Sequence, residues 1–151
     1  MLMRSGLDGL PSGPEPERAA GAEAEFGSLA ERHGVEEVNF TFDGHPMARA
    51  RGIRMLNHEE LQAGDVSLEY VSRVMGRRYT DAPTLQRILQ TLWYQVNRGQ
   101  EIYVVGTVLD DGTVRGGTGW GAEFAKICNK PLHVFDQEHD GWFTWDGDAF
   151  V

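Results

Sequence analysis

The sequence has no long apolar run, almost no cysteine, and fewer basic than acidic side chains. No apolar stretch approaches the roughly 20 residues that span a bilayer, which argues against a membrane protein and a signal peptide. The single cysteine, Cys128, excludes an internal disulfide and is consistent with a cytoplasmic location. The formal net charge of −9 argues against a nucleic-acid partner, because such proteins usually display a basic face.

The histidines lack the spacing of a metal site. Zinc sites usually take several Cys or His ligands in a short, regular pattern, whereas the five histidines are scattered along the chain. One of them, His133, alternates with Leu132 and Val134, which is typical of a strand position. We therefore expect no bound metal and no certain cofactor.

The length of 151 residues suits one domain with a sizeable core. Three of the six prolines fall within residues 1–20. This composition predicts a flexible N-terminal segment with at most a short strand at its start. We expect residues 21–151 to form a single domain.

Apolar residues at helical spacing predict helices over about 22–33, 65–75 and 82–98, each followed by a glycine. In the second helix one apolar face is expected from Val66, Tyr70, Val71 and Val74. The third helix has more apolar side chains than one sheet face would cover. We expect some of them to be exposed, and the candidates include Leu92, Trp93 and Tyr94. We therefore expect a homo-oligomer, with a symmetric dimer as the simplest form.

Strand patterns alternate with these helices. Alternation of Val38, Phe40 and Phe42 predicts a strand of about five residues, and runs rich in β-branched residues predict strands over 101–109 and 132–136. The last two runs show little polar alternation, as expected for strands covered on both faces. The order of elements predicts an α/β fold with a mainly parallel sheet flanked by helices in three layers. Near the end of the chain, residues 139–147 are expected to form a small hairpin or an edge strand.

A glycine-rich segment follows the strand at 101–109, with four glycines in the six positions from 116 to 121. Glycine permits positive φ angles and lets a ligand approach the backbone closely. The helix expected after this segment would direct its free N–H groups and the positive end of its dipole at the loop. Ligands of parallel sheets also bind at the carboxyl ends of strands. A phosphate group is therefore the predicted ligand of this loop.

The segment 115–123 is similar to the Pro-Gly-Gly-x-Gly-Thr-x-x-Glu motif of the LOG family. That family belongs to the SLOG group of Rossmann-like nucleotide-binding proteins. The matching positions are Gly116, Gly117, Gly119 and Glu123. The continuation KICNKPLHVFD and the earlier GAEAEFG also resemble this group, so the order of elements is similar over roughly residues 21–136. The resemblance implies a Rossmann-like fold and a phosphate-binding loop.

The chain departs from the family pattern in three places. Arg115 stands where the family has Pro, and Trp120 stands where it has Thr. The family's Arg-Lys-x-x-Met segment, which supplies a catalytic arginine, is not present in that form. The nearest candidates are Arg73 and the pair Arg77 and Arg78, and neither is a match.

Each remaining residue of the segment has two interpretations. The resemblance implies that Glu123 acts on a ribose hydroxyl or on cationic charge as an N-glycosidic bond breaks, whereas a carboxylate in a first helical turn also complements the dipole. Thr118 either donates its hydroxyl to a phosphate or shapes the turn. Arg115 either binds the phosphate in bidentate fashion or is a solvated loop arginine. Trp120 either stacks on a base or ribose or covers the edge of the sheet.

Other charged residues have the same ambiguity. Arg49, Arg51 and Arg54 form a basic stretch that suits a second anion contact, intersubunit salt bridges or a solvated face. Asp136 ends a strand near the loop and either faces a ribose hydroxyl or forms a turn.

The first functional hypothesis is that the loop binds a nucleotide or a nucleotide-derived phosphate. The second is a phosphoribohydrolase-like N-glycosidase that acts on nucleoside 5′-monophosphates with Glu123 and an arginine. The third is a non-catalytic assembly protein. The expected partners are a small phosphate-bearing ligand and further copies of the chain.

Overall fold

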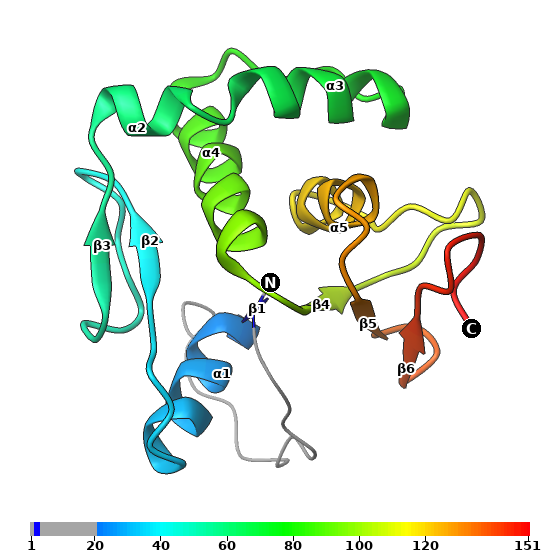
Figure 1. The fold of residues 1–151 in the computed structure, drawn as a ribbon, viewed down its shortest axis with the longest axis horizontal. Coiled ribbons are helices and arrows are strands. Elements are labelled where there is room, and N and C mark those ends of the chain that lie inside the picture. The colour runs from blue at the N-terminus through cyan, green and yellow to red at the C-terminus, as the bar shows by residue number, and fades with distance from the viewer. Residues whose placement is uncertain (1, 4–20) are drawn as a thin grey trace.

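A computed structural model describes residues 2–3 and 21–151, so the segment expected to be flexible at 1–20 lies outside the described residues except for a two-residue strand. The chain contains both helices and strands, and helices α3, α4 and α5 lie next to one another (Figure 1). In order, the elements are β1 (Leu2–Met3), α1 (Gly21–Arg32), β2 (Asn39–Thr41), β3 (Ile53–Met55), α2 (His58–Gln62), α3 (Asp65–Met75), α4 (Pro83–Arg98), β4 (Ile102–Gly106), α5 (Thr118–Ile127), β5 (Leu132–Asp136) and β6 (Gly141–Thr144).

The strands form two small sheets. The larger has the order β1-β4-β5-β6, and the smaller is the parallel pair β2-β3. Within the larger sheet only β4 and β5 are parallel, with Ile102 opposite Leu132 and Gly106 opposite Asp136. Strands β1 and β6 run antiparallel to their neighbours. The α/β class is confirmed, but the expectation of a mainly parallel sheet is corrected. The expected hairpin within residues 139–147 is replaced by a single edge strand, β6, which pairs antiparallel with β5.

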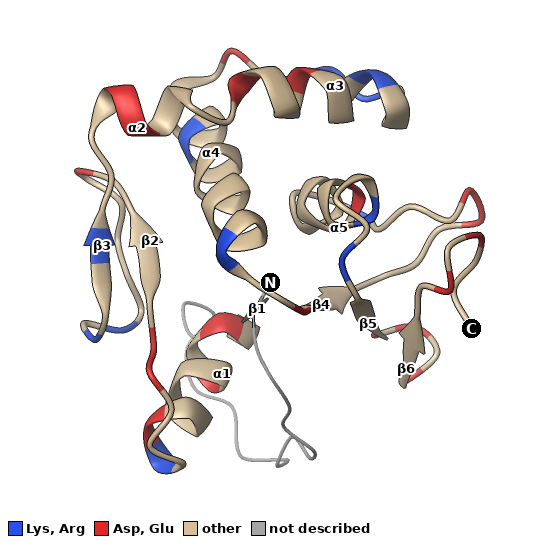
Figure 2. Cartoon of the chain, viewed as in Figure 1, with Lys and Arg blue, Asp and Glu red and all other residues tan. Residues whose placement is uncertain are grey.

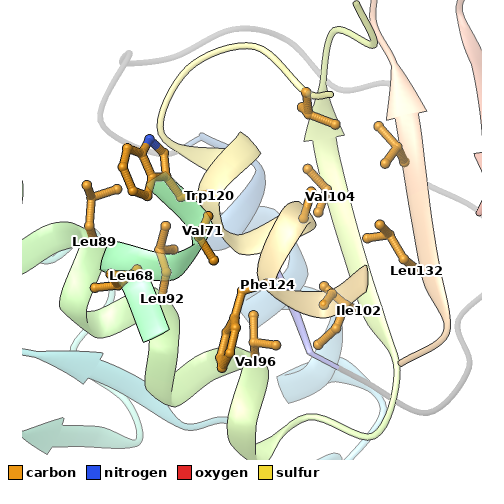
Figure 3. Packing of buried hydrophobic residues seen from close by; sticks show 14 residues of the cluster. Leu68, Val71, Leu89, Leu92, Val96, Ile102, Val104, Trp120, Phe124 and Leu132 are labelled. Atoms are coloured by element: carbon orange, nitrogen blue, oxygen red, sulfur yellow. The ribbon is translucent and has the colours of Figure 1, made fainter. Parts of the chain in front are cut away.

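The main core lies between one face of the larger sheet and helices α3, α4 and α5 (Figure 3). The strands contribute alternate residues to it, and Ile102, Val104, Leu132 and Val134 are fully buried. The residues between them on β4 and β5 are half-buried, as is usual when a strand is covered on one face. The three-layer arrangement is therefore not confirmed. On this second face, aromatic rings pack against one another, namely those of Tyr103, His133, Phe135 and Trp142.

The apolar residues of α4 that suggested an oligomer surface are used within the chain. Leu92 is buried. Trp93 Nε1 donates a hydrogen bond to Ser67 Oγ on α3 at 3.2 Å, and the Tyr94 hydroxyl donates to the Glu60 carbonyl of α2 at 2.8 Å. These contacts join α4 to α2 and α3, so this part of α4 does not form an exposed apolar patch.

The basic stretch between β2 and α2 is also paired within the chain. Its three arginines contact acidic side chains of α1, of α2 and of the segment that links α1 to β2. The hydrogen bond from Arg49 lowers the pKa of Glu37. The ion pairs are Arg49 with Glu31 and Glu37, Arg51 with Glu31, and Arg54 with Glu60.

Candidate functional site

A loop of residues 107–117 connects the end of β4 to the start of α5, and we call this loop the excursion. The Thr107 carbonyl accepts the Arg115 N–H at 2.9 Å, and the Thr113 carbonyl accepts the Leu109 N–H at 2.8 Å. At the tip, Asp111 Oδ1 accepts hydrogen bonds from the N–H and the hydroxyl of Thr113, which lower the pKa of the Asp111 carboxyl. These bonds close the excursion and hold the start of α5 near the carboxyl end of β4.

The glycine loop presents backbone N–H groups that have no acceptor in the described part of the chain. They belong to Gly116, Gly117 and Thr118, whereas the N–H groups of the next two residues donate to the Gly116 and Gly117 carbonyls. Gly116 has a φ of +74°, a conformation that favours glycine. A Cβ added at Gly116 or Gly117 would meet no atom within 4 Å, so the space on the Cβ side of both glycines is open. We call these three donors the loop N–H groups.

Two arginines lie at the loop, and only one of them was expected there. Arg115 is exposed, and its Nη1 lies 3.0 Å from Glu138 Oε1. Arg77, from the segment after α3, donates to the Val114 carbonyl at 2.9 Å and to Thr113 Oγ1 at 2.8 Å. Its Nη1 also donates to the Gly116 carbonyl at 3.5 Å, so Arg77 braces both the excursion and the first glycine of the loop. From the sequence, Arg77 was considered only as a candidate that does not match the family's catalytic-arginine segment, and nothing in its spacing indicates this contact.

Thr118 begins α5, and its hydroxyl donates to the Arg115 carbonyl at 3.3 Å. This bond is the turn-shaping role considered from the sequence. Because a hydroxyl oxygen also accepts hydrogen bonds, this contact leaves the side chain able to bind a further donor.

Gly119 and Trp120 lie inside α5 and face the protein. A Cβ added at Gly119 would lie 2.0 Å from the Val114 carbonyl oxygen, so this glycine permits close packing of the helix on the excursion. Trp120 is buried in the core (Figure 3). Its ring centroid lies 5.7 Å from that of Tyr79. The structure therefore gives Trp120 a packing role, and its ring is not at the open side of the loop.

Glu123 lies in the second turn of α5 rather than the first, because the helix begins at Thr118. Its Oε2 is 3.2 Å from Lys126 Nζ, without hydrogen-bond geometry, and both side chains are largely buried. Lys126 donates to the Gly112 carbonyl at 2.7 Å and lies 3.9 Å from the ring centroid of Trp145. The carboxylate thus belongs to a cluster between α5, the tip of the excursion and the C-terminal segment.

Asp136 is buried at the end of β5, and both of its carboxylate oxygens are occupied. Oδ1 accepts the Glu138 N–H at 2.9 Å, and Oδ2 lies 2.7 Å from His139 Nδ1. The hydrogen bond with His139 lowers the pKa of Asp136, and the same bond raises the pKa of His139. Asp136 therefore closes the β5-β6 turn, which is the simpler of its two interpretations.

The Asp136–His139 pair makes stability depend on pH. The pKa of His139 is raised, so its contribution is complete below about 6.5 and is lost as the pH rises through the higher folded-state value. The pKa of Asp136 is lowered, so its contribution is present above about 4 and is lost at lower pH. We expect His139→Gln to lower the thermal midpoint more at pH 6 than at pH 9. A difference between variant and wild type that does not change over this range would contradict the pairing.

A cavity of about 550 Å³ lies elsewhere, between α1, the residues before β2 and the C-terminal half of α4. Its wall includes Phe26, Val38, Gln95 and Arg98. It also reaches Gln100, just before β4, whereas the glycine loop follows the other end of that strand. The two places are separated by the length of β4, about 16 Å. No sequence pattern indicated this cavity, because its wall comes from segments that lie far apart in the chain.

No family model, curated protein or solved structure matches the chain. Across residues 2–3 and 21–151, no helix has both the length and the apolar character needed to cross a bilayer. The same residues contain no cluster of three or more His, Cys, Asp or Glu side chains able to hold a metal ion.

Proposed function

We propose that the chain binds the phosphate of a nucleotide or nucleotide-derived molecule at the loop N–H groups of Gly116, Gly117 and Thr118. The observation that carries the proposal is that these three donors have no acceptor in the described chain, and the Cβ side of both glycines is open. Backbone N–H groups at a helix start are suited to an oxyanion, and the helix dipole favours negative charge there. The similarity of the segment to a nucleotide-binding motif supports the same ligand.

Arg115 supports the proposal through charge. Its guanidinium is exposed beside the loop and pairs with Glu138, which is also more than half exposed. An exposed pair of this kind contributes little to stability, so Arg115 can exchange Glu138 for a phosphate at small cost. Guanidinium groups bind phosphate in bidentate fashion.

The test is a thermal-shift titration with adenosine 5′-monophosphate and ADP-ribose, with adenosine as the phosphate-free control. A ligand at 100 times its dissociation constant adds about 2.7 kcal/mol to the stability, which raises the midpoint by several degrees. We expect a shift with the phosphate compounds and a smaller one, or none, with adenosine. The proposal fails if neither phosphate compound shifts the midpoint or if adenosine shifts it equally.

Two isosteric variants separate loss of binding from loss of folding. Gly117 has φ −63° and ψ −38°, which any L-residue adopts, and its Cβ position is open. Gly117→Asp places a carboxylate beside the loop N–H groups, where it also suits the helix dipole, so we expect a stable protein that no longer binds phosphate. Gly117→Asn has the same shape without the charge and is expected to retain more affinity. Equal affinities in the two variants would count against an anion site.

The proposal is limited to binding. The Glu123 carboxylate is paired with Lys126 in a largely buried cluster, so no observed contact favours a role in breaking an N-glycosidic bond. Assay of the same samples for release of free adenine from the monophosphate tests the hydrolase alternative directly.

A further inference from the structure

Helix α3 has an apolar face that the described residues of one chain leave exposed. Leu68 and Val71 are fully buried against the core, whereas Val66, Tyr70 and Val74 are 84%, 57% and 50% exposed. These three exposed residues are four positions apart, so they form one stripe along consecutive turns. Helix α3 runs along the outer edge of the molecule, with its buried side toward α4 and α5 (Figure 1).

Charged residues flank this stripe in a self-complementary order. Glu69 and Arg73 are exposed beside it, and neither has an ion pair within the described chain. More broadly, α2 and the start of α3 carry acidic residues, while the end of α3 carries Arg73 and is followed by Arg77 and Arg78 (Figure 2). A helix that is acidic at one end and basic at the other complements a second, antiparallel copy of itself.

We infer that the outer face of α3, formed by Val66, Glu69, Tyr70, Arg73 and Val74, docks the same face of a second copy of the chain. With a two-fold axis at Tyr70, the two Tyr70 rings meet, and Val66 of each chain lies level with Val74 of the other. The rise of 1.5 Å per residue places Arg73 about 3 Å along the axis from Glu69 of the other copy, within the reach of an arginine. Both residues remain on the same side of the helix pair, so two ion pairs form.

A second copy fits this surface better than an unrelated partner. An isologous interface requires one patch to satisfy itself, and both the apolar stripe and the two charges do so when the helix is reversed. The helix is only about 16 Å long, so the contact buries less surface than a standard interface of about 1,600 Å². The dimer is therefore one that dissociates on dilution.

Sedimentation velocity of the full chain over a range of concentrations tests the inference. We expect the wild type to pass from monomer to dimer as its concentration rises. Tyr70→Glu places two carboxylates at the symmetry axis and is expected to abolish the dimer. Met55→Glu, at an exposed apolar position on β3, is the matched control and is expected to leave it unchanged.

Charge exchange tests the antiparallel arrangement itself. Glu69→Arg and Arg73→Glu each bring like charges together across both symmetric contacts, so each is expected to weaken the dimer about tenfold or more. The double variant restores opposite charges and is expected to recover the affinity, with circular dichroism used to confirm that α3 remains folded. A chain that stays monomeric at every concentration, or a dimer unaffected by Tyr70→Glu, overturns the inference. Failure of the double exchange to recover affinity overturns the antiparallel geometry.

Discussion

Replacement of Gly119 by alanine is expected to lower the free energy of unfolding by about 3 kcal/mol. The added Cβ would lie 2.0 Å from the Val114 carbonyl oxygen and 2.7 Å from Arg77 Nη1. The arginine head is able to move, but the carbonyl belongs to the backbone of the excursion that leads into α5. Either the helix shifts away from the core, or the carbonyl turns and loses its hydrogen bond to Arg77 at 2.9 Å. Urea unfolding followed by circular dichroism measures the loss.

Gly117→Ala is the matched control, because it adds the same methyl group two residues earlier. Gly117 has helical dihedral angles and no atom within 4 Å of its Cβ position. Removing a glycine from a position that tolerates alanine usually stabilises a protein by about 0.4–1 kcal/mol. The two variants should therefore differ in sign. If Gly119→Ala were as stable as Gly117→Ala, the close packing of α5 on Val114 would be disproved.

The contrast between these glycines also shows how far the sequence determines the candidate site. The pattern correctly predicted a strand, a glycine loop, a helix and a second strand in this order, and β4, α5 and β5 bear this out. The same pattern predicted that the helix begins after Gly121, because glycine is unfavourable inside a helix by about 1 kcal/mol relative to alanine. Tertiary packing overrides that preference. The helix begins at Thr118, and the burial of Trp120 and the fit of Gly119 on Val114 stabilise the early start.

The arrangement of the sheet was less predictable for a related physical reason. Periodicity within a segment reports which side of a strand or helix is buried, and it correctly indicated helix α4 and strand β5. It does not report which strand lies alongside, because pairing depends on hydrogen bonds between distant segments. The antiparallel direction of β1 and the separate β2-β3 pair were missed for this reason. The bracing of the loop by Arg77 was missed too, since its partners lie 36 and 37 positions away.

Replacement of Lys130 by methionine is expected to destabilise the protein by about 2 kcal/mol. Helix α4 is followed by the capping residue Gly99, whose φ of −73° is not the left-handed conformation that usually satisfies the last carbonyl groups. Lys130 satisfies these carbonyl groups instead. Its Nζ donates to the carbonyls of Val96, Asn97 and Gly99 at 2.5, 2.9 and 2.6 Å. Methionine has a similar shape but no donor, so these carbonyls would lose a charged partner near the start of β5.

Two further variants distinguish the contribution of the Lys130 charge to stability from that of its hydrogen-bond geometry. Arg98→Met removes an exposed positive charge from the last turn of the same helix, and a charge there contributes about 0.3–1 kcal/mol through the dipole. Lys130→Arg keeps the charge, but a planar guanidinium does not reach three converging carbonyls as an ammonium does. We expect stability to fall in the order wild type, Arg98→Met, Lys130→Arg and Lys130→Met in urea unfolding. If Lys130→Met lowered the free energy of unfolding no more than Arg98→Met does, the hydrogen bonds of Lys130 would contribute nothing beyond a charge at the helix end. Another group would then have to satisfy the carbonyls of α4.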